Sequence, residues 1–267
     1  MQYEDSFKPL YDFVRKKMTK VPKRRYKSVT KPLLEIMNEA YQTILSISED
    51  PVTGSPNSAQ TRYDYIVDAQ EKLLRAEKPL WVYWNICGDI NEPDMKDQRV
   101  KQRQNLCERF NYVLRLLRKI QLESSKYNPE NDKVVDAEIL YYTEDEIANA
   151  QFLSTLRELH RFTHGKIVRM TNIFKDAEAD ILLKLVDDAW YYAARGNKNR
   201  LDKEKEREDR KKFFSRAISD LYKMERPLFS IFSLGHYSNN EMKDWMHLLN
   251  ESLRLLQAVQ QSDKRRT

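Results

Sequence analysis

Apolar residues recur every three or four positions along most of this chain, which is the period of an amphipathic α-helix. Between residues 30 and 47 they form one continuous stripe, as expected for a helix with one buried face. Pro79 is expected to kink or divide a helix, because proline removes a backbone donor and crowds the preceding turn. The pattern predicts helices over residues 3–19, 30–47, 58–87, 95–124, 143–166, 176–195, 202–234 and 239–261.

The composition supports a helical protein without strands. The chain has only 5 Gly among its 267 residues, and 40% of the residues are hydrophobic, which is enough for a folded core. Sheet proteins and phosphate-binding enzymes need more glycine, since glycine supplies tight turns and close backbone approaches. Good helix formers dominate instead. We therefore predict an all-α fold.

Parts of the two halves of the chain resemble each other in the same order. A Pro-Leu pair inside a helix, at 79–80 and again at 227–228, is the most specific match. Generic similarity between amphipathic helices is the alternative, but an interior proline costs about 3 kcal/mol unless the fold uses the bend. The matching segments are 33–41 with 182–190, 62–84 with 210–232 without a gap, and 114–117 with 253–256.

This internal match predicts two tandem up-down helical bundles of about four helices each. Residues 1–124 form the first unit, and residues 143–267 form a second, divergent unit. Residues 125–135 are polar and contain Asn-Pro and Asn-Asp steps, which is typical of a linker, and we place the linker over 125–142. Thr143 and Glu146 have the spacing of a capping box at the start of the second unit.

The clearest local feature is a run of positive charge between residues 15 and 31, with nine basic residues and no acidic one. Clustered cations of this kind neutralise phosphates and release counterions, which gives nucleic-acid affinity that depends on salt. Tyr26 lies within the run and offers a ring on which a base can stack. The basic residues are Arg15, Lys16, Lys17, Lys20, Lys23, Arg24, Arg25, Lys27 and Lys31.

A second basic group projects from the helix predicted over 95–124, away from its apolar stripe. If this helix neighbours the first basic run, the two groups form one continuous surface for phosphates. The alternative is an ordinary solvated face, but a run this long without an acid favours nucleic acid. The group consists of Lys101, Arg115, Arg118 and Lys119.

An opening amphipathic helix is followed by a Pro22-Lys23 turn, the helix over 33–47, a long helix opening at Arg62 and a final amphipathic helix. In this order the segment from about Phe7 to Gln121 resembles a family of small four-helix bundles. That family includes the accessory variability determinant of diversity-generating retroelements and the bundle proteins encoded by intervening sequences. The resemblance implies a basic, non-catalytic nucleic-acid binder, which in the retroelement branch also binds a reverse transcriptase and its template RNA.

His160 and His164 stand one helical turn apart, a spacing that is able to bind a metal ion. No cysteine or carboxylate of matching spacing lies near them in the sequence, so we expect a core or surface pair and assign no metal ligand. Asp187 and Asp188 are adjacent, and a helix directs adjacent side chains differently, so we expect no carboxylate pair.

Two further features are interpreted as core. The aromatic segment 81–84 is expected to pack around the Pro79 bend, and its counterpart 229–232 supports this interpretation. A partner-binding patch or a stacking platform is the alternative. Cys87 and Cys107 lack the spacing of a zinc ribbon and are expected to be buried, inert thiols.

No glycine-rich phosphate loop, nucleophile elbow or paired carboxylates stand out, so we predict no catalytic residue, no cofactor and no enzyme. Neither a signal-peptide pattern nor an apolar run of the ~20 residues that span a membrane is present, and two isolated thiols suggest a reducing cytoplasm. The leading hypothesis is an accessory protein that binds nucleic acid, RNA being favoured over DNA, and assists a reverse transcriptase or other mobile-element machinery. A helical protein-interaction scaffold is the alternative, and oligomer formation stays open.

Overall fold

The computed structural model describes residues 3–21, 26–49, 56–87, 96–123, 138–170, 178–235 and 237–266. Every regular element in these ranges is a helix, so the all-α prediction is confirmed. The chain divides into two compact units, Met1–Tyr141 and Tyr142–Thr267. Within the described ranges, no helix combines the length and the apolar character that crossing a membrane requires.

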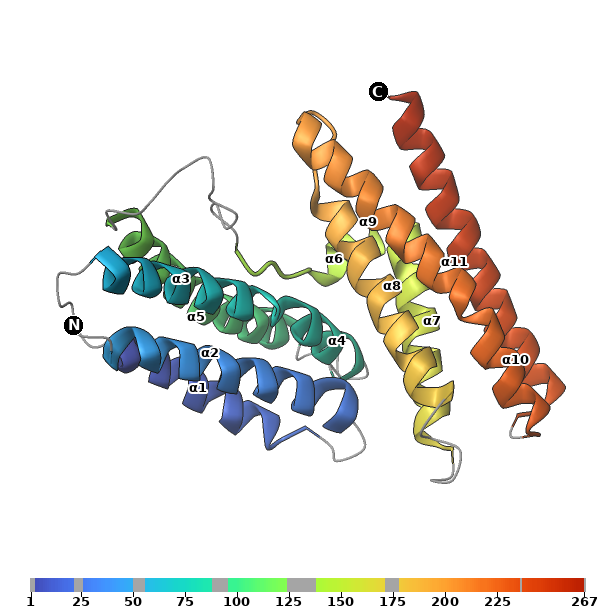
Figure 1. Cartoon of the computed structure of the whole chain (residues 1–267). Helices are drawn as coiled ribbons and strands as arrows, with labels where there is room; N and C mark the ends of the chain where they lie inside the picture. The colour runs from blue at the N-terminus through green and yellow to red at the C-terminus, as the bar shows by residue number, and fades with distance from the viewer. Residues whose placement is uncertain are drawn as a thin grey trace. The chain divides into compact units, whose positions relative to one another are not determined.

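In the first unit, four long helices contact one another in a closed ring (Figure 1). α1 packs on α2, α2 on α3, α3 on α5, and α5 on α1, and successive long helices run in opposite directions. The elements are α1 (Tyr3–Met18), the short π-helical turn η2 (Tyr26–Thr30), α2 (Lys31–Glu49), α3 (Pro56–Leu74), α4 (Glu77–Cys87) and α5 (Lys96–Glu123).

The apolar stripe of each helix forms the core of this unit. Burying one large apolar side chain stabilises a fold by about 1.5–3 kcal/mol, so the stripes hold the ring of helices together. On the first two helices the buried apolar residues are Phe7, Leu10, Val14, Met18, Leu33, Met37, Ala40, Ile44 and Ile47.

The helix predicted over 58–87 is divided, as expected from its proline. α3 ends at Leu74 and α4 begins at Glu77, so Pro79 lies in the first turn of α4. A proline is tolerated there because the N–H that it lacks would have no partner within the helix. The break therefore precedes the proline and does not fall on it.

The segment 138–141 is irregular and packs against the first unit. Ile139 is buried, its N–H donates to Oδ1 of Asn111 at 2.8 Å, and its carbonyl accepts from Nδ2 of the same residue at 3.1 Å. The N–H of Leu140 donates to Oε1 of Glu77 at 2.8 Å. These residues belong to the stretch predicted as the linker, and hydrogen bonds between their backbone and side chains of the bundle fix them to the first unit.

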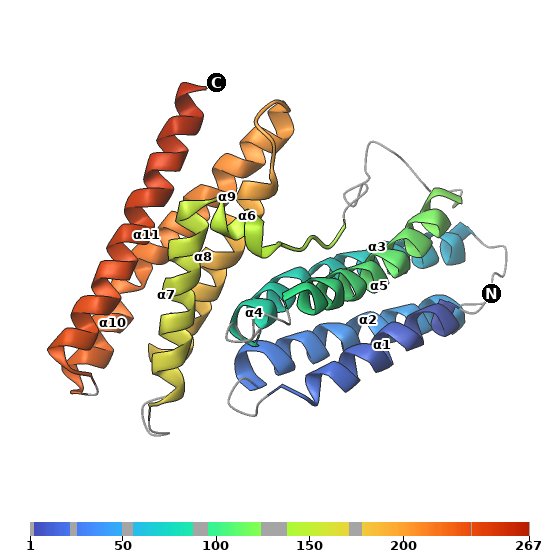
Figure 2. The ribbon, with the colours of Figure 1, turned by 180° about the vertical axis from the view of Figure 1, so that it is seen from behind.

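The second unit has a ring of the same kind, in which α7, α8, α9 and α11 contact one another in that order. Figure 2 shows α7 and α11 side by side, which closes the ring. The elements are α6 (Glu144–Ala148), α7 (Gln151–Val168), α8 (Asp180–Lys198), α9 (Glu204–Lys223), α10 (Glu225–Ser233) and α11 (Asn239–Arg265).

The predicted capping box at the start of the second unit is confirmed. The Thr143 hydroxyl accepts from the N–H of Glu146 at 3.1 Å, and the Glu146 carboxylate accepts from the N–H of Thr143 at 2.8 Å. The helix that begins here ends at Ala148, and α7 begins at Gln151. The prediction of one helix over 143–166 is therefore wrong, since the chain leaves the helix after one turn.

The two units also share the position of a helix break. α9 ends at Lys223 and α10 begins at Glu225, and the gap-free match of 62–84 with 210–232 aligns this break with the one between α3 and α4. The tandem duplication of one ancestral unit stays a prediction.

The correspondence has one clear exception. Trp81, Val82 and Trp84 are buried, which confirms the core interpretation for the first copy. Phe229 aligns with Trp81 but is 55% exposed, so the expectation of core packing is wrong for Phe229. Cys107 is buried as expected, and burial raises the pKa of its thiol; the side chain of Cys87 lies outside the described residues.

Candidate functional site

The C-terminal half of α1 and the turn that follows it present three exposed cations, Arg15, Lys16 and Lys20. The buried stripe of α1 passes through Val14 and Met18, so these three side chains lie away from the core. Within the described part of the chain none of the three forms an ion pair, in contrast with many other basic residues. They form a surface of uncompensated positive charge.

Lys17 of the same helix is less exposed. Its ammonium lies 5.4 Å from the centre of the Phe13 ring, which is a cation–π contact. Lys17 therefore contributes charge at the edge of the surface, with its stem packed on the helix.

The turn η2 carries the next described residues of the basic run and packs against α2 and α4. Val29 and Thr30 are buried and anchor the turn, whereas Lys27 is exposed and the ring of Tyr26 is 52% exposed. Lys31 opens α2 and is exposed, with its ammonium 3.8 Å from Glu35. The predicted residues Lys23, Arg24 and Arg25 lie outside the described residues.

The basic residues of α5 are in a different situation. Arg115 is exposed, but it forms ion pairs with Glu108 and, at 3.2 Å, with Glu138. The hydrogen bond that its guanidinium donates to Glu108 raises the pKa of Arg115. Arg118 is only partly exposed and donates to Gln121 at 2.9 Å. The two carboxylates offset the charge of Arg115, and the amide oxygen of Gln121 accepts one hydrogen bond from Arg118.

The remaining two lysines of this group are exposed. The ammonium of Lys119 lies 3.9 Å from Glu123 one helical turn away, a spacing at which exposed pairs interact weakly. Lys101 is exposed near the beginning of α5.

α1 and α5 run in opposite directions and contact each other (Figure 1). The guanidinium of Arg109 lies 4.4 Å from the centre of the Phe13 ring, which fixes the register of the two helices. From this contact, Lys20 and Lys101 lie toward the same end of the unit. The other three members of the predicted basic group lie toward the opposite end, so the structure does not bring them to the cations of α1. They are Arg115, Arg118 and Lys119.

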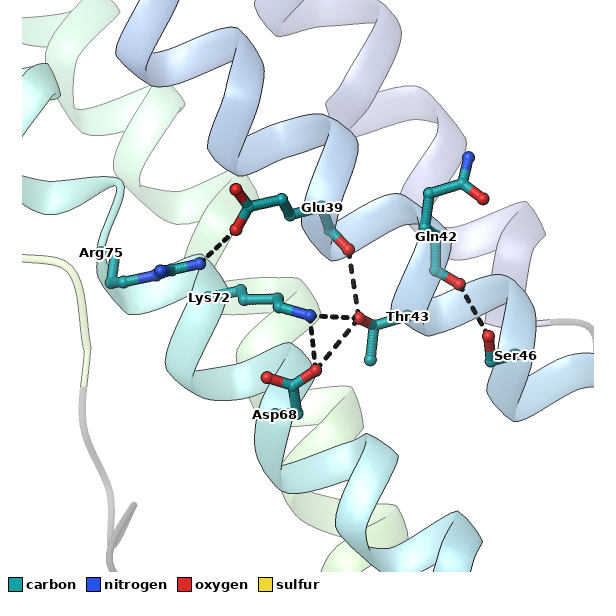
Figure 3. A network of polar contacts seen from close by, with 7 residues as sticks. All are labelled: Glu39, Gln42, Thr43, Ser46, Asp68, Lys72 and Arg75. Carbon is teal, nitrogen blue, oxygen red and sulfur yellow. Dashed lines mark hydrogen bonds and ion pairs between the residues drawn. The ribbon is translucent and has the colours of Figure 1, made fainter.

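Two cations beside α2 are engaged in ion pairs and hydrogen bonds (Figure 3). Lys72 donates to Oγ1 of Thr43 at 2.8 Å and to Oδ2 of Asp68 at 2.5 Å. Arg75 pairs with Glu39 at 2.5 Å. Such charges are compensated within the protein, which distinguishes them from the cations of α1.

A second cluster of interest lies in the second unit, between α7 and α8. Nε2 of His160 and Nε2 of His164 contact the same carboxylate oxygen, Oδ1 of Asp187, at 2.8 and 2.7 Å. The two histidines have no exposed surface, and Asp187 is buried. The two histidines are therefore a core pair, one of the two placements expected from the sequence, and their carboxylate partner comes from the neighbouring helix.

The protonation states of this cluster follow from burial and from its own contacts. Burial lowers the pKa of His160 to about 4, because a charged imidazolium is poorly solvated inside the protein. Burial alone would raise the pKa of Asp187, but His164 and His160 outweigh it and hold that pKa well below its usual range. Near neutral pH the cluster therefore contains an ionised carboxylate and a neutral His160.

The first unit has a polar contact at the equivalent place. The hydroxyl of Tyr11 on α1 donates to Oδ1 of Asn38 on α2 at 2.6 Å. Tyr11 stands 149 positions before His160, and Asn38 stands 149 positions before Asp187, the offset of the 33–41 match. Extending that match to the opening helices would have pointed to Asp187 as the partner of His160.

Comparison with protein-family models, curated proteins and solved structures finds no match to this chain. The resemblance of the first unit to retroelement accessory bundles therefore stays a prediction. Function has to be argued from the chain's own residues.

Proposed function

We propose that this is a non-enzymatic accessory protein that binds nucleic acid through a surface on its first unit. The surface, here named the α1–η2 surface, consists of Arg15, Lys16, Lys20, Tyr26, Lys27 and Lys31. The observation that carries the proposal is the absence of ion pairs at Arg15, Lys16 and Lys20 within the described residues.

Uncompensated cations favour phosphate over water because binding releases counterions from the nucleic acid. Cations that already pair with carboxylates, such as Arg115 and Arg75, contribute less free energy to phosphate binding, since a phosphate must compete with the existing partner. The half-exposed ring of Tyr26 adds a stacking face, which suits unpaired bases of RNA better than a closed duplex.

The proposal extends to a cytoplasmic partner of a reverse transcriptase or of other mobile-element machinery. This extension is supported only by the resemblance of the first unit to the four-helix bundles named above. It predicts that the preferred ligand is a structured RNA with single-stranded loops.

The test is a binding titration of the full chain against structured RNA, single-stranded DNA and duplex DNA at two salt concentrations. The variant Arg15→Ala/Lys16→Ala/Lys20→Ala is expected to bind at least about tenfold more weakly at low salt. Its log–log salt slope should be shallower by about 2–3, since each phosphate contact contributes about 0.7–0.9.

The matched control removes the same charge from the second unit, where each lysine has a carboxylate neighbour: Lys203→Ala/Lys212→Ala/Lys223→Ala. This variant should keep the affinity and the salt slope of the unchanged protein. No binding to any of the three nucleic acids at low salt, or equal losses in both triple variants, would refute the proposal.

A protein-interaction scaffold is the second candidate, and the exposure of Phe229 favours it. A ring that is 55% exposed where the first unit buries a tryptophan leaves apolar area available to a partner. A second copy of this chain is the partner that can be tested directly. Sedimentation of the unchanged protein and of Phe229→Ser should then show a shift toward monomer in the variant, and identical sedimentation would count against this candidate.

A further inference from the structure

We propose that His160, His164 and Asp187 form a binding site for a divalent first-row transition metal ion, for which Zn²⁺ is the first probe. The structure juxtaposes two imidazole nitrogens from one turn of α7 with a carboxylate oxygen from α8. This site is distinct from the α1–η2 surface and does not depend on it.

The ligand set is suited to such an ion. Imidazole nitrogen and carboxylate oxygen are the usual protein ligands of catalytic Zn²⁺, and two histidines with one carboxylate also hold non-haem Fe²⁺. Histidines four residues apart on a helix lie on one face, so both can reach one ion. The three candidate ligand atoms lie within 4.8 Å of one another.

Only small movements are needed to admit an ion. In the structure the histidine nitrogens lie 2.7–2.8 Å from the carboxylate oxygen, as hydrogen bonds require. Ligand atoms around a tetrahedral Zn²⁺ stand about 3.3 Å apart when the metal–ligand bonds are about 2.0–2.1 Å long. Small rotations of the imidazole rings and the carboxylate move these atoms apart by a few tenths of an ångström and provide this separation. Each imidazole must then carry its proton on Nδ1, so that the lone pair of Nε2 is free to coordinate the ion.

The bundle itself does not require this cluster. The equivalent positions of the first unit are Tyr11, Arg15 and Asn38, and a single hydrogen bond between the first and the last joins α1 to α2 there. Buried imidazoles and a buried carboxylate cost free energy that a tyrosine–asparagine pair avoids. Their presence in the second unit is explained by a ligand that needs this set of atoms.

Three protein ligands leave one position of a tetrahedral ion for water or for another small ligand. Closed structural zinc sites use four protein ligands, so the site belongs to the three-ligand class. The cluster therefore predicts a bound ion that retains one exchangeable ligand.

The experiment uses the full chain, without an affinity tag that binds metal, stripped with a chelator and then equilibrated with Zn²⁺. After desalting, bound zinc is counted by mass spectrometry, and affinity is measured by competition with a chromogenic chelator. We expect one equivalent per chain. Nitrogen NMR of the histidine side chains should show Nε2 of His160 and His164 shifting on zinc addition, a measurement that needs no variant.

Asp187→Asn keeps a hydrogen-bond acceptor and the shape of the side chain, but loses the charged ligand. The variant should bind zinc at least about 100-fold more weakly. Loss of a residue that only hydrogen-bonds to a metal ligand lowers metal affinity by about 10–100-fold, and loss of a ligand itself should have a larger effect. His160→Tyr/Asp187→Asn rebuilds the pair found in the first unit and serves as a second variant should the single one fail to fold. His247→Gln changes an exposed histidine on α11 and should bind zinc like the unchanged protein.

Co²⁺ provides an independent readout, because a tetrahedral Co²⁺ site gives strong visible absorption that disappears when zinc displaces the ion. Any one of three results overturns the proposal. The first is less than one equivalent of zinc in the unchanged protein, and the second is unshifted Nε2 signals at saturation. The third is equal zinc affinity in the unchanged protein and in a folded Asp187 variant.

Discussion

The hydroxyl of Tyr11 donates a hydrogen bond to Asn38, and the two residues occupy the places that His160 and Asp187 occupy in the second unit. In both units this contact joins the first long helix of the ring to the second. In the first unit Asn38 is exposed, whereas in the second unit Asp187 is buried and accepts from two histidines. The two units thus join the corresponding pair of helices with hydrogen bonds that should contribute very differently to the free energy of unfolding.

Removing the acceptor should reveal this difference. Asp187→Ala leaves two buried imidazole N–H groups without their acceptor and should lower the free energy of unfolding of the second unit by about 3–5 kcal/mol. Asn38→Ala removes one exposed hydrogen bond and should cost less than about 1 kcal/mol. Urea unfolding of both variants measures the two costs, and similar values would contradict the assignment of a buried network.

Acidification should weaken the second unit through the same residues. The pKa of His160 falls from 6.5 in the unfolded chain to about 4 in the fold, so between these values the unfolded state binds the extra proton. Stability therefore decreases as the pH is lowered through this window, by up to about 3 kcal/mol. The pKa of Asp187 is also lowered, so its contribution is lost at still lower pH.

The measurement is the urea midpoint at several values between about pH 7 and about pH 4. His160→Gln should flatten the dependence in that window, because the residue that titrates differently in the two states is gone. His247→Gln, at an exposed position, should leave the dependence unchanged. A slope that is identical in the unchanged protein and in His160→Gln would show that other groups cause it.

The helical periodicity predicts most of the helices, because it shows which face of each helix is buried. The interruption after Ala148 was missed because no proline or glycine marks it. The position of the break near Pro79 was predicted only approximately, since proline is tolerated anywhere in a first turn. Local sequence therefore predicts elements better than their ends.

The candidate sites depend on contacts that local patterns do not contain. The basic run was visible in the sequence, but the ion pairs that compensate Arg115 join residues up to 23 positions apart. Asp187 lies 27 positions from His160, and only the packing of α7 on α8 brings them together. In the sequence, this contact is indicated by the match between the two halves of the chain, which aligns Tyr11 with His160 and Asn38 with Asp187.

The irregular segment after α5 should depend on one side chain. Asn111 exchanges two hydrogen bonds with the backbone of Ile139, and Nε1 of Trp81 donates to the carbonyl of Leu140 at 2.7 Å. Asn111→Ala leaves buried backbone groups without partners and should destabilise the first unit by about 2–3 kcal/mol. Hydrogen exchange at the amides of Ile139 and Leu140 should accelerate.

Asn105→Ala on the same helix is the matched control. Asn105 is exposed, and among the described residues its side chain accepts from Arg109 and contacts neither Ile139 nor Leu140, so its loss should leave the exchange of both amides unchanged. Unaltered protection in Asn111→Ala would mean that the segment is held by Glu77 and Trp81 alone.

Two helical glycines should respond to alanine in opposite directions. A Cβ at Gly196 on α8 would stand 2.9 Å from two ring atoms of Phe214 on α9. That ring is fully buried, packs edge-on against Phe152 and lies beneath the guanidinium of Arg210, so it has no room to move aside. Gly196→Ala must therefore separate α8 from α9 and should lower stability by about 1–3 kcal/mol.

Gly165 on α7 has no neighbouring atom within 4 Å of the equivalent Cβ position. Alanine there meets no obstacle and removes conformational freedom from the unfolded chain, so Gly165→Ala should raise stability by about 0.5–1 kcal/mol. Urea unfolding of the two variants distinguishes the outcomes by sign. A stabilising Gly196→Ala would show that α8 and α9 do not approach as closely as the Phe214 contact requires, because the penalty arises only from that approach.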